Sequence, residues 1–166
     1  MMGAQPDESL TAARPGTVLG GKYRVERELA RGGMGIVVIA THLKLDRPVA
    51  IKLLSLEGKD RAYVGARFLR EARAAARLTG DHVVRIIDLD ETPHGTPYLV
   101  MEFLDGVDLE FALKTEGPAA PGRAVDWVLQ ACAALAEAHA RGVVHRDVKP
   151  SNLLRVKRVD GVELIK

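Results

Sequence analysis

The sequence predicts an α+β fold in which a small antiparallel sheet carrying one helix precedes a mainly helical region. Short runs of β-branched residues separated by turn residues fill residues 23–54 and recur in residues 83–104. Two longer segments, 62–80 and 123–142, place apolar residues at helical spacing instead. A sheet with one helix, followed by a separate helical region, is the arrangement of an α+β protein.

Length and composition are those of a soluble globular protein with one or two modest domains. Of the 166 residues, 47% are hydrophobic and 28% charged, with a formal net charge of +2. No basic run with interleaved aromatic residues is present, so we expect no nucleic-acid partner. No apolar run approaches about 18 residues and no signal peptide is recognisable, so we expect no membrane contact within this segment. The single Cys132 cannot form an internal disulfide, which favours a reducing, cytoplasmic location.

The chain is predicted to have three parts. Residues 1–16 are small and polar and contain two prolines, so we predict a disordered tail without a packing role. Residues 17–104 form the sheet-containing region, and residues 105–166 form the helical region that follows it.

The sheet-containing region is predicted to begin with an antiparallel meander of three strands. One strand ends near Leu29, one spans residues 36–40 and one spans residues 49–54, with a Gly-rich turn and a Leu-Asp-Arg-Pro turn between them. Two more apolar runs, residues 83–89 and 97–104, are separated by the turn-forming Glu-Thr-Pro-His-Gly-Thr. Together they give a five-stranded sheet.

The helix of this region follows the third strand and ends at Gly80. It is rich in Ala and Arg, and its apolar residues recur on one helical face. That face consists of Phe68, Leu69, Ala72, Ala75 and Leu78.

The helical region opens with a loop-rich connection and a short helix, and a long helix then runs over residues 123–142 and ends at Gly142. This helix is apolar on almost all of its sides, so we expect it to be buried. The residues after it include a hairpin turned by Asp160 and Gly161, and they are too few to bury the helix.

The first motif with chemical meaning is the turn Glu-Leu-Ala-Arg-Gly-Gly-Met-Gly, which a β-branched run follows. It is either an ordinary turn or a hairpin lid whose bare backbone approaches phosphate groups. A dinucleotide-binding fingerprint or a phosphate-binding P-loop needs a helix directly after the glycines. Because a strand follows here, both of these are excluded.

The second motif is Val-Ala-Ile-Lys on the third strand. Strand alternation places Ala50 and Lys52 on the face beneath the glycine turn. Lys52 is either a solvated edge charge or a cation that binds phosphate. Glu71 on the following helix is either a surface charge paired with Arg67 or the carboxylate that holds Lys52.

The third motif is His-Arg-Asp-Val-Lys-Pro-Ser-Asn, residues 145–152, which follows the long helix. Asp147 can orient an attacking hydroxyl and accept its proton, and Lys149 can neutralise charge on a transferring phosphoryl group. Asn152 can offer an amide oxygen to Mg²⁺. The alternative is a polar surface loop with a Pro-containing turn, and the presence of the other motifs in order favours catalysis.

The chain resembles the bacterial Hanks-type serine/threonine protein kinases, because five features occur in the order found in that family. They are the glycine turn, Val-Ala-Ile-Lys, a helical Glu, an acidic hinge segment and the third motif. The resemblance covers about residues 17–166. It implies a protein-kinase-like fold, comprising the small lobe and the start of the large lobe, with ATP and Mg²⁺ as cofactors. It also implies transfer of the ATP γ-phosphoryl group to serine or threonine hydroxyls of protein substrates, and it is compatible with a homodimer of the full-length form.

The resemblance assigns roles residue by residue. Lys52 would pair with the α and β phosphates and Glu71 would hold Lys52. Asp147 resembles the catalytic base, Asn152 a Mg²⁺ ligand, and Lys149 the corresponding residue of the serine/threonine class. The nucleotide-binding set that it implies is Ala30, Gly32, Gly33, Gly35, Val37, Ala50, Lys52, Met101, Glu102, Leu104 and Leu154.

Two features depart from the family pattern. Ala30 stands where the first glycine of the lid is expected, which adds only a methyl group. The sequence reaches Lys166 without an Asp-Phe-Gly tripeptide, whose Asp is a second Mg²⁺ ligand. We therefore expect the N-terminal part of a longer catalytic domain, nearly inactive by itself. The alternatives are a non-catalytic kinase-like module that binds a nucleotide or a partner, and a broken gene without function.

Overall fold

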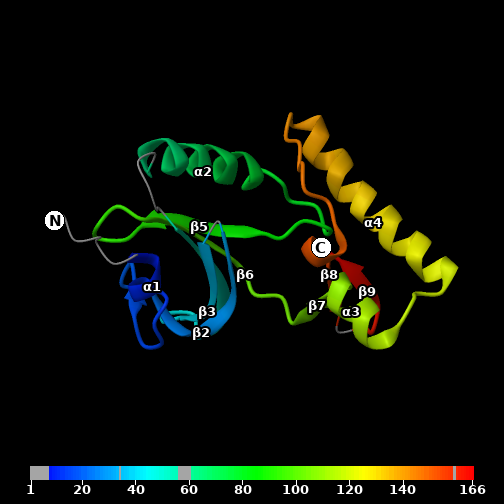
Figure 1. The fold of residues 1–166 in the computed structure, drawn as a ribbon, viewed down its shortest axis with the longest axis horizontal. Coiled ribbons are helices and arrows are strands. Elements are labelled where there is room, and N and C mark those ends of the chain that lie inside the picture. The colour runs from blue at the N-terminus through cyan, green and yellow to red at the C-terminus, as the bar shows by residue number, and fades with distance from the viewer. Residues whose placement is uncertain (1–7, 34, 56–60, 159) are drawn as a thin grey trace. The chain divides into compact units, whose positions relative to one another are not determined.

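The computed structural model forms two compact units (Figure 1). Its described residues are 8–33, 35–55, 61–158 and 160–166. The first unit comprises the described residues up to Ala76 together with residues 86–103, and the second comprises residues 77–85 and 104–166. Residues 77–85 therefore belong to the second unit, although the sequence placed them in the sheet-containing region.

The first unit is an antiparallel sheet with a helix on either side, α1 (Glu8–Ala12) and α2 (Arg61–Ala75) (Figure 1). In the described residues the sheet has six strands in the order β1-β2-β3-β4-β6-β5. Their bounds are β1 (Val18–Leu19), β2 (Tyr23–Gly32), β3 (Gly35–His42), β4 (Arg47–Leu54), β5 (Ile86–Glu91) and β6 (Pro97–Glu102). The predicted meander and strand pair are confirmed, and the two-residue strand β1 is an addition at the edge of the sheet.

The core of the first unit lies on one face of this sheet. Alternation along β4 sends Val49, Ile51 and Leu53 to that face, where all three are fully buried. Ala12 and Ala13, at the end of α1, pack against the same cluster. Residues 8–13 thus have a packing role, contrary to the prediction for the tail, and residues 1–7 lie outside the described part.

The sheet curls until its two ends meet. β2 lies next to the edge strand β1, and β5 is the strand at the opposite edge, yet the Tyr23 hydroxyl donates to the Asp88 carboxylate at 3.0 Å. Lys22 Nζ lies 3.0 Å from the same carboxylate oxygen. Strand twist allows this closure. Burial, followed by the bond to Asp88, raises the pKa of Tyr23 to about 12.

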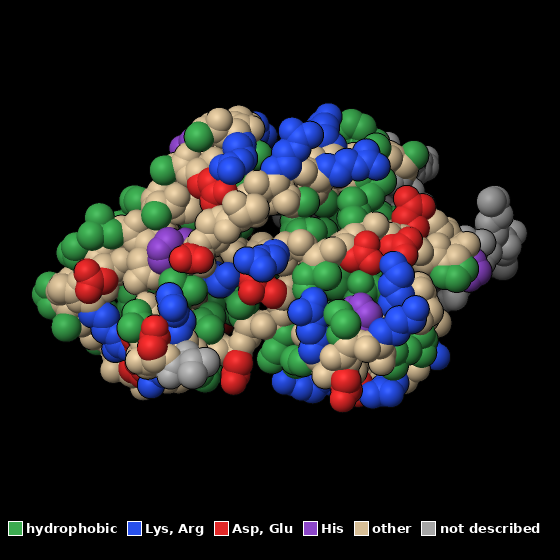
Figure 2. All heavy atoms as spheres, turned by 180° about the vertical axis from the view of Figure 1, so that it is seen from behind, with side chains coloured by type: hydrophobic (Ala, Val, Ile, Leu, Met, Phe, Trp, Pro, Cys, Tyr) green, Lys and Arg blue, Asp and Glu red, His purple; other side chains and the backbone are tan. Residues whose placement is uncertain are grey.

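Helix α2 has the predicted apolar face but ends earlier than predicted. Ala72 and Leu78 are buried, while the opposite side carries arginines, seen as the blue side chains over α2 in Figure 2. The helix ends at Ala75 rather than near Gly80. The reason is that the Thr79 and Gly80 backbone N–H groups donate to the Glu137 carboxylate instead of to helical carbonyls.

The second unit combines two helices with a small antiparallel sheet. The helices are α3 (Leu109–Glu116) and α4 (Pro121–Ala140), with a 3₁₀ turn η1 (Pro150–Asn152). The strands are β7 (Gly106–Asp108), β8 (Leu154–Lys157) and β9 (Glu163–Ile165), in the order β7-β8-β9. The predicted hairpin of β8 and β9 is confirmed, whereas β7 was not predicted. Asp108 caps α3 by accepting from the Phe111 N–H at 2.8 Å.

Helix α4 buries only one of its apolar sides. Trp127 and Ala138 are buried, but Val125, Val128 and Leu129 are 56%, 61% and 61% exposed. Hydrophobic side chains are accordingly visible along α4 in Figure 2. One apolar side of α4 is thus left uncovered by the described residues. None of the described helices is both long and apolar enough to cross a membrane.

Candidate active site

The candidate catalytic loop follows α4 and reverses its direction at Arg146. Arg146 has a φ of 64°, which is unusual for a residue other than glycine. Next to it, the Asp147 N–H lies 3.3 Å from His145 Nδ1 and donates to it. The turn η1 then brings Asn152 back towards Asp147, with the Asn152 N–H donating to the Lys149 carbonyl at 2.9 Å.

The loop brings together the three residues that the sequence singled out. Lys149 Nζ lies 2.9 Å from Asp147 Oδ2, and Asn152 Nδ2 donates to the same oxygen at 3.0 Å. Asn152 Nδ2 also donates to the Asp147 carbonyl at 2.8 Å. The hydrogen bond from Lys149, followed by that from Asn152, holds the pKa of Asp147 below its ordinary value. Asp147 is therefore ionised at neutral pH.

Two oxygens in this cluster remain available for ligands. Within the described part of the chain, Asp147 Oδ1 and the Asn152 side-chain oxygen accept no hydrogen bond, because the contacts of both residues run through Asp147 Oδ2, the Asp147 carbonyl and Asn152 Nδ2. The first suits a hydroxyl donor. The second is a hard oxygen ligand of the kind that Mg²⁺ accepts beside phosphate oxygens. No group of three or more His, Cys, Asp or Glu residues that could hold a metal occurs among the described residues.

In the first unit, four of the predicted nucleotide-binding residues, Val37, Ala50, Lys52 and Met101, lie in two rows across the sheet face opposite the core. Val37 pairs with Lys52, and Lys52 pairs with Leu99. Ala50 pairs with Met101 in the neighbouring row. Directly paired residues of antiparallel strands project to the same face. The alternation that the sequence predicted for Ala50 and Lys52 is thus confirmed.

The glycine turn is a hairpin between β2 and β3, as predicted. Gly32 pairs with Gly35, and a side chain at Gly32 or Gly33 would meet nothing within 4 Å. Gly35 has a φ of 136°, and a Cβ there would lie 2.0 Å from the Leu53 carbonyl oxygen. A glycine is therefore required at position 35 to hold the hairpin against β4. The Met34 position lies outside the described residues.

Lys52 and Glu71 are not paired in this structure. Glu71 forms an ion pair with Arg67 at 2.8 Å, one helical turn away, and its side chain is 60% exposed. Lys52 is half-buried and forms no ion pair with any residue that the structure describes. The surface pairing considered for Glu71 is thus the one observed, and its role in holding Lys52 stays a prediction.

The remaining predicted residues are divided between the two units. Met101 and Glu102 end β6 in the first unit, while Leu104 begins the second and Leu154 begins β8. All four are half-buried. Their contact with an adenine ring remains a prediction.

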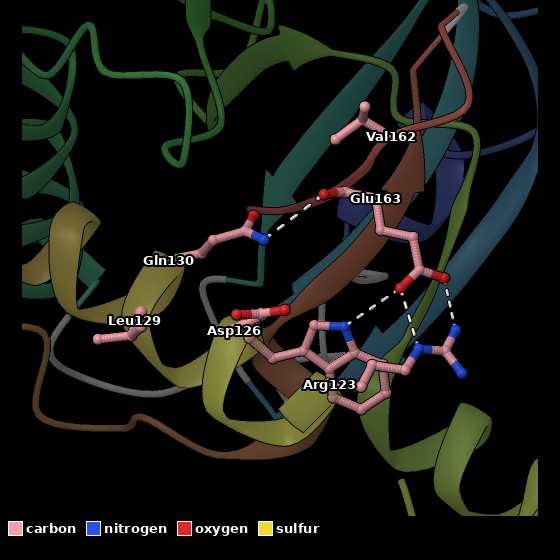
Figure 3. A pocket seen from close by; sticks show the side chains of 7 residues that line it. Arg123, Asp126, Leu129, Gln130, Val162 and Glu163 are labelled. Carbon is pink, nitrogen blue, oxygen red and sulfur yellow. Dashed lines mark hydrogen bonds and ion pairs between the residues drawn. The ribbon is translucent and has the colours of Figure 1, made fainter. Parts of the chain in front are cut away.

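A polar network that the sequence did not reveal joins α4 to β9. Arg123 Nε donates to Glu163 Oε2 at 3.0 Å, and Trp127 Nε1 donates to the same oxygen at 3.4 Å (Figure 3). The Arg123 guanidinium also stacks over the Trp127 ring at 4.9 Å. The hydrogen bond from Arg123 lowers the pKa of Glu163. These side chains line a groove of about 460 Å³ between α4 and β9.

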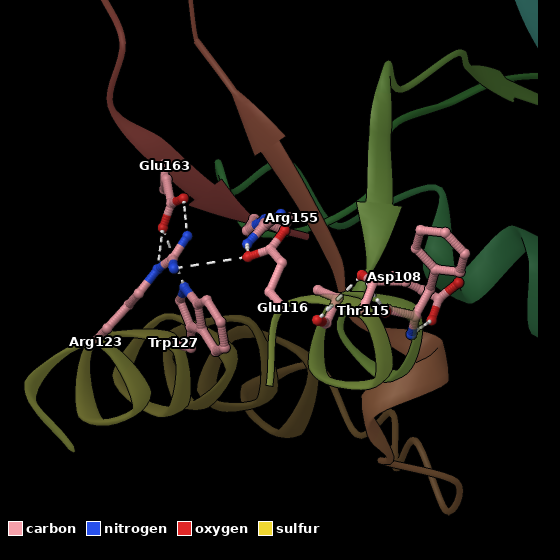
Figure 4. Close-up of polar contacts among 9 residues, drawn as sticks. Asp108, Thr115, Glu116, Arg123, Trp127, Arg155 and Glu163 are labelled. Atoms are coloured by element: carbon pink, nitrogen blue, oxygen red, sulfur yellow. Dashed lines mark hydrogen bonds and ion pairs between the residues drawn. The ribbon is translucent and has the colours of Figure 1, made fainter. Parts of the chain in front are cut away.

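The network continues to β8, which directly follows the catalytic loop. Glu116, at the end of α3, accepts from Arg155 Nη1 at 2.7 Å and lies 3.8 Å from Arg123 (Figure 4). Arg155 stands next to Leu154 on β8. Through these ion pairs, α3 and α4 hold the strand that begins two residues after Asn152.

A curled antiparallel sheet with a lysine on its free face, together with a helical unit whose loop gathers an Asp, a Lys and an Asn, is the architecture of a protein kinase. The sequence model of the protein kinase domain matches residues 23–166, and the chain belongs to this family. It is the N-terminal part of a bacterial Hanks-type serine/threonine kinase domain, as the sequence predicted.

Bacterial kinases are similar over most of the chain. Serine/threonine-protein kinase PknD from Mycobacterium tuberculosis is 48% identical over 134 residues, which are 81% of this chain and 20% of PknD. Serine/threonine-protein kinase Pkn1 from Myxococcus xanthus is 42% identical over 146 residues, 88% of this chain and 21% of Pkn1. The chain thus spans about a fifth of the length of these relatives.

Solved structures agree with the fold. The crystal structure of the Mycobacterium tuberculosis PknI kinase domain superposes with a TM-score of 0.75 at 32% identity. The match covers 92% of this chain and 61% of the PknI chain. The protein kinase fold predicted from the motifs is confirmed.

Proposed function

We propose that this chain supplies the small lobe and the catalytic loop of a kinase that transfers the γ-phosphoryl group of ATP to serine or threonine hydroxyls of protein substrates. The observation that carries the proposal is the Asp147 carboxylate. One of its oxygens is held by Lys149 and Asn152, and the other accepts no bond from the described residues. This arrangement leaves one oxygen of an ionised carboxylate able to accept a hydrogen bond from a substrate hydroxyl.

In the proposed reaction, the substrate hydroxyl donates its hydrogen bond to Asp147 Oδ1, which orients the hydroxyl oxygen towards the γ-phosphorus. A new O–P bond forms, the bond from the γ-phosphorus to the β,γ-bridging oxygen breaks, and ADP leaves. The hydroxyl proton passes to Asp147. Because the lowered pKa makes Asp147 a weak base, it serves first to orient the hydroxyl and receives the proton only as the O–P bond forms.

Cations neutralise the phosphate charge in this proposal. Lys149, already beside Asp147, would turn towards the γ-phosphoryl group as its charge develops. Lys52 would bind the α and β phosphates from the free face of the sheet, beneath the glycine hairpin, with Glu71 holding its ammonium group. The adenine ring would lie against Val37, Ala50 and Leu154.

Members of this kinase family use ATP and Mg²⁺. The free side-chain oxygen of Asn152 fits Mg²⁺, which takes few protein ligands when phosphate oxygens supply others. When bound, the ion neutralises charge on the phosphates. Because residues 1–166 contain no Asp-Phe-Gly ligand, we expect the polypeptide to bind nucleotide more readily than it transfers phosphate. The cytoplasmic location, which the single Cys132 favours, and the protein substrates that the resemblance implies remain proposals.

Nucleotide binding by the polypeptide of residues 1–166 tests the proposal. A fluorescent ATP analogue should bind more tightly with Mg²⁺ than without it, and Asn152→Ala should remove this difference. Lys52→Met should weaken binding roughly tenfold or more, because it removes a charge-assisted contact to phosphate. Equal affinities for Lys52→Met and the parent chain, with no effect of Mg²⁺, would overturn the proposal.

The catalytic role of Asp147 needs a separate measurement. Any residual phosphoryl transfer should fall about 100-fold or more in Asp147→Asn, which keeps the size of the side chain but puts a donor near the acceptor position. Asp126→Asn is the matched control, since Asp126 is an exposed carboxylate on α4 in the same unit. Transfer that is insensitive to Asp147→Asn would show that this carboxylate is not the base. Nucleotide binding without such transfer would favour a non-catalytic binding module.

A further inference from the structure

Strand β8 carries a charged side chain on the face that packs against the helices of the second unit. Arg155 pairs with Ile165 of β9, and directly paired residues of antiparallel strands project to the same face. Ile165 is fully buried in the apolar cluster around Trp127, and Leu153, two residues before Arg155, packs against that cluster. The Arg155 side chain is itself only 12% exposed. An arginine therefore stands where strand alternation would place an apolar side chain.

Glu116, the last residue of α3, neutralises this charge. Arg155 Nη1 donates to Glu116 Oε2 at 2.7 Å, and Arg155 Nη2 donates to Glu116 Oε1 (Figure 4). Such a two-pronged contact between a guanidinium and a carboxylate is among the stronger ion pairs in proteins. The hydrogen bond from Arg155 lowers the pKa of Glu116, so the carboxylate stays ionised at neutral pH. We refer to these two residues as the Glu116–Arg155 pair.

Helix α3 is attached to the three-stranded sheet at both of its ends. Its start follows β7 directly, and the Leu109 N–H donates to the Leu153 carbonyl, next to β8, at 2.9 Å. Its end lies about 10 Å further along, at a rise of about 1.5 Å per residue, and Glu116 ties it to Arg155 there. The apolar cluster that the described residues form beside the helix has only three buried members. The ion pair therefore contributes much of the attachment at the end of α3.

The residue before Arg155 projects to the opposite face of the sheet. Leu154 pairs with Asp108 of β7, whereas Arg155 pairs with Val107, and side chains alternate along a strand. We propose that Glu116 and Arg155 are positioning residues: their ion pair holds one face of β8 against α3 and thereby fixes the Leu154 side chain on the other face, for contact with the nucleotide base. This inference rests on the proposed function, which places Leu154 against adenine.

The affinity for adenosine tests the proposal, because adenosine carries the base without the phosphates. In Glu116→Ala the Arg155 charge loses its partner, so the end of α3 and the sheet should separate until water reaches the guanidinium. Calorimetric titration should show adenosine binding roughly 2- to 30-fold weaker, the range for mutations that act through an intervening element. ATP binding should weaken by the same factor, whereas Lys52→Met should weaken ATP binding more than adenosine binding. Unchanged adenosine affinity in Glu116→Ala would overturn the proposal.

Glu110→Ala is the matched control. Glu110 lies on the same helix and pairs with Lys114, one helical turn along, at 2.8 Å. Removing it deletes a carboxylate and an ion pair from α3 without touching β8. We expect the adenosine affinity to be unchanged in this variant. A loss as large as that of Glu116→Ala would show that the affinity follows the charge of the helix, and it would contradict the positioning role.

A substitution of the partner separates positioning from a general loss of charge. Arg155→Leu removes the charge that needs Glu116 and puts an apolar side chain on the face that packs against the helices. In this background Glu116→Ala should change the adenosine affinity by less than about twofold, because the contact that it breaks is already gone. An effect that does not act through Arg155 would persist in both backgrounds. Equal losses in the two backgrounds would therefore overturn the proposal.

Amide hydrogen exchange decides on the Glu116–Arg155 pair without any nucleotide. The Leu154 N–H donates to the Lys166 carbonyl at 2.8 Å, and the Leu109 N–H reports on the start of α3. In Glu116→Ala both amides should exchange roughly tenfold faster or more, because the loss of a charge-assisted hydrogen bond favours local opening. Amides of β4, in the first unit, are the internal reference and should not change. Unchanged exchange at Leu109 and Leu154 would overturn the positioning role. If Lys52→Met leaves the ATP affinity unchanged, the proposed function fails instead, and hydrogen exchange still decides whether the pair holds β8.

Discussion

Each of the two units is stabilised internally by a different kind of interaction. The first unit has a continuous apolar core on one face of its sheet, with Val38, Val49 and Ile51 among its fully buried members. The buried core of the second unit is a small cluster around Trp127, and a network of ion pairs joins α3, α4 and β9 around it. Burial of apolar surface thus dominates in one unit, and paired charges contribute much more in the other.

This difference has consequences for stability. Apolar burial is insensitive to pH and salt, and its contribution grows with the area removed from water. Ion pairs that remain partly solvated contribute less and depend on both pH and salt. We therefore expect the second unit to unfold at a lower urea concentration than the first.

The chromophores allow the units to be followed separately. All three tyrosines, Tyr23, Tyr63 and Tyr98, lie in the first unit, and the single Trp127 lies in the second. Tryptophan fluorescence therefore reports unfolding of the second unit, and the tyrosine signal in near-ultraviolet circular dichroism reports the first.

The largest effect should come from the core of the first unit. Ile51→Ala should lower its free energy of unfolding by about 2–5 kcal/mol, because Ile51 is fully buried and the truncation leaves a cavity. The tyrosine-monitored urea midpoint should fall accordingly, while the Trp127-monitored midpoint should change little. A parallel fall of both midpoints would break the comparison, since it would show that the two units unfold as one.

A smaller loss should follow from the ion-pair network of the second unit. Glu163→Ala should cost about 1–3 kcal/mol in the Trp127-monitored transition, because Arg123 and Trp127 lose their common acceptor. Glu28→Ala is the control, since Glu28 forms an exposed ion pair with Arg31 in the first unit. If Glu163→Ala changes the Trp127 transition no more than Glu28→Ala does, the network contributes nothing measurable.

Acid should act on the same network. The pKa of folded Glu163 lies below its ordinary value of 4.5, so its contribution is complete above that value and is lost as pH falls through the lower folded pKa. The Trp127-monitored midpoint should therefore decline below about pH 4.5, and Glu163→Gln should decline less steeply. The loss cannot exceed that of Glu163→Ala at neutral pH. Parallel slopes for the two proteins would assign the acid sensitivity to other groups.

The sequence predicted best what is encoded locally. Alternation along β4 placed Ala50 and Lys52 on one face, and the structure buries Val49, Ile51 and Leu53 on the other face, which packs on the core. Asp147 and Asn152 were predicted to act from one short loop, and a single 3₁₀ turn suffices to bring them together. The kinase fold followed from the order of such local motifs.

Features that depend on distant partners were missed. The Arg123–Glu163 pair joins residues forty positions apart, and no local pattern marks either charge as part of a network. The sequence placed the end of α2 near Gly80 rather than at Ala75. It could not show that the Thr79 N–H donates to Glu137, because Glu137 lies far along the chain. Helix α1 is too short to show a periodicity, and its buried Ser9 is a polar residue typical of a surface.

The smallest effect is expected on the outer face of α4. Val128 is 61% exposed, so Val128→Lys should change the Trp127-monitored free energy of unfolding by no more than about 0.5 kcal/mol. Ala138→Lys is the contrasting variant, because Ala138 is buried on the other side of the same helix and a lysine there must displace packed atoms or bury its charge. A loss of more than about 1 kcal/mol in Val128→Lys, approaching that of Ala138→Lys, would mean that the outer face is covered in solution. The second unit would then owe its stability to apolar burial as the first does, and the contrast between the two units would be lost.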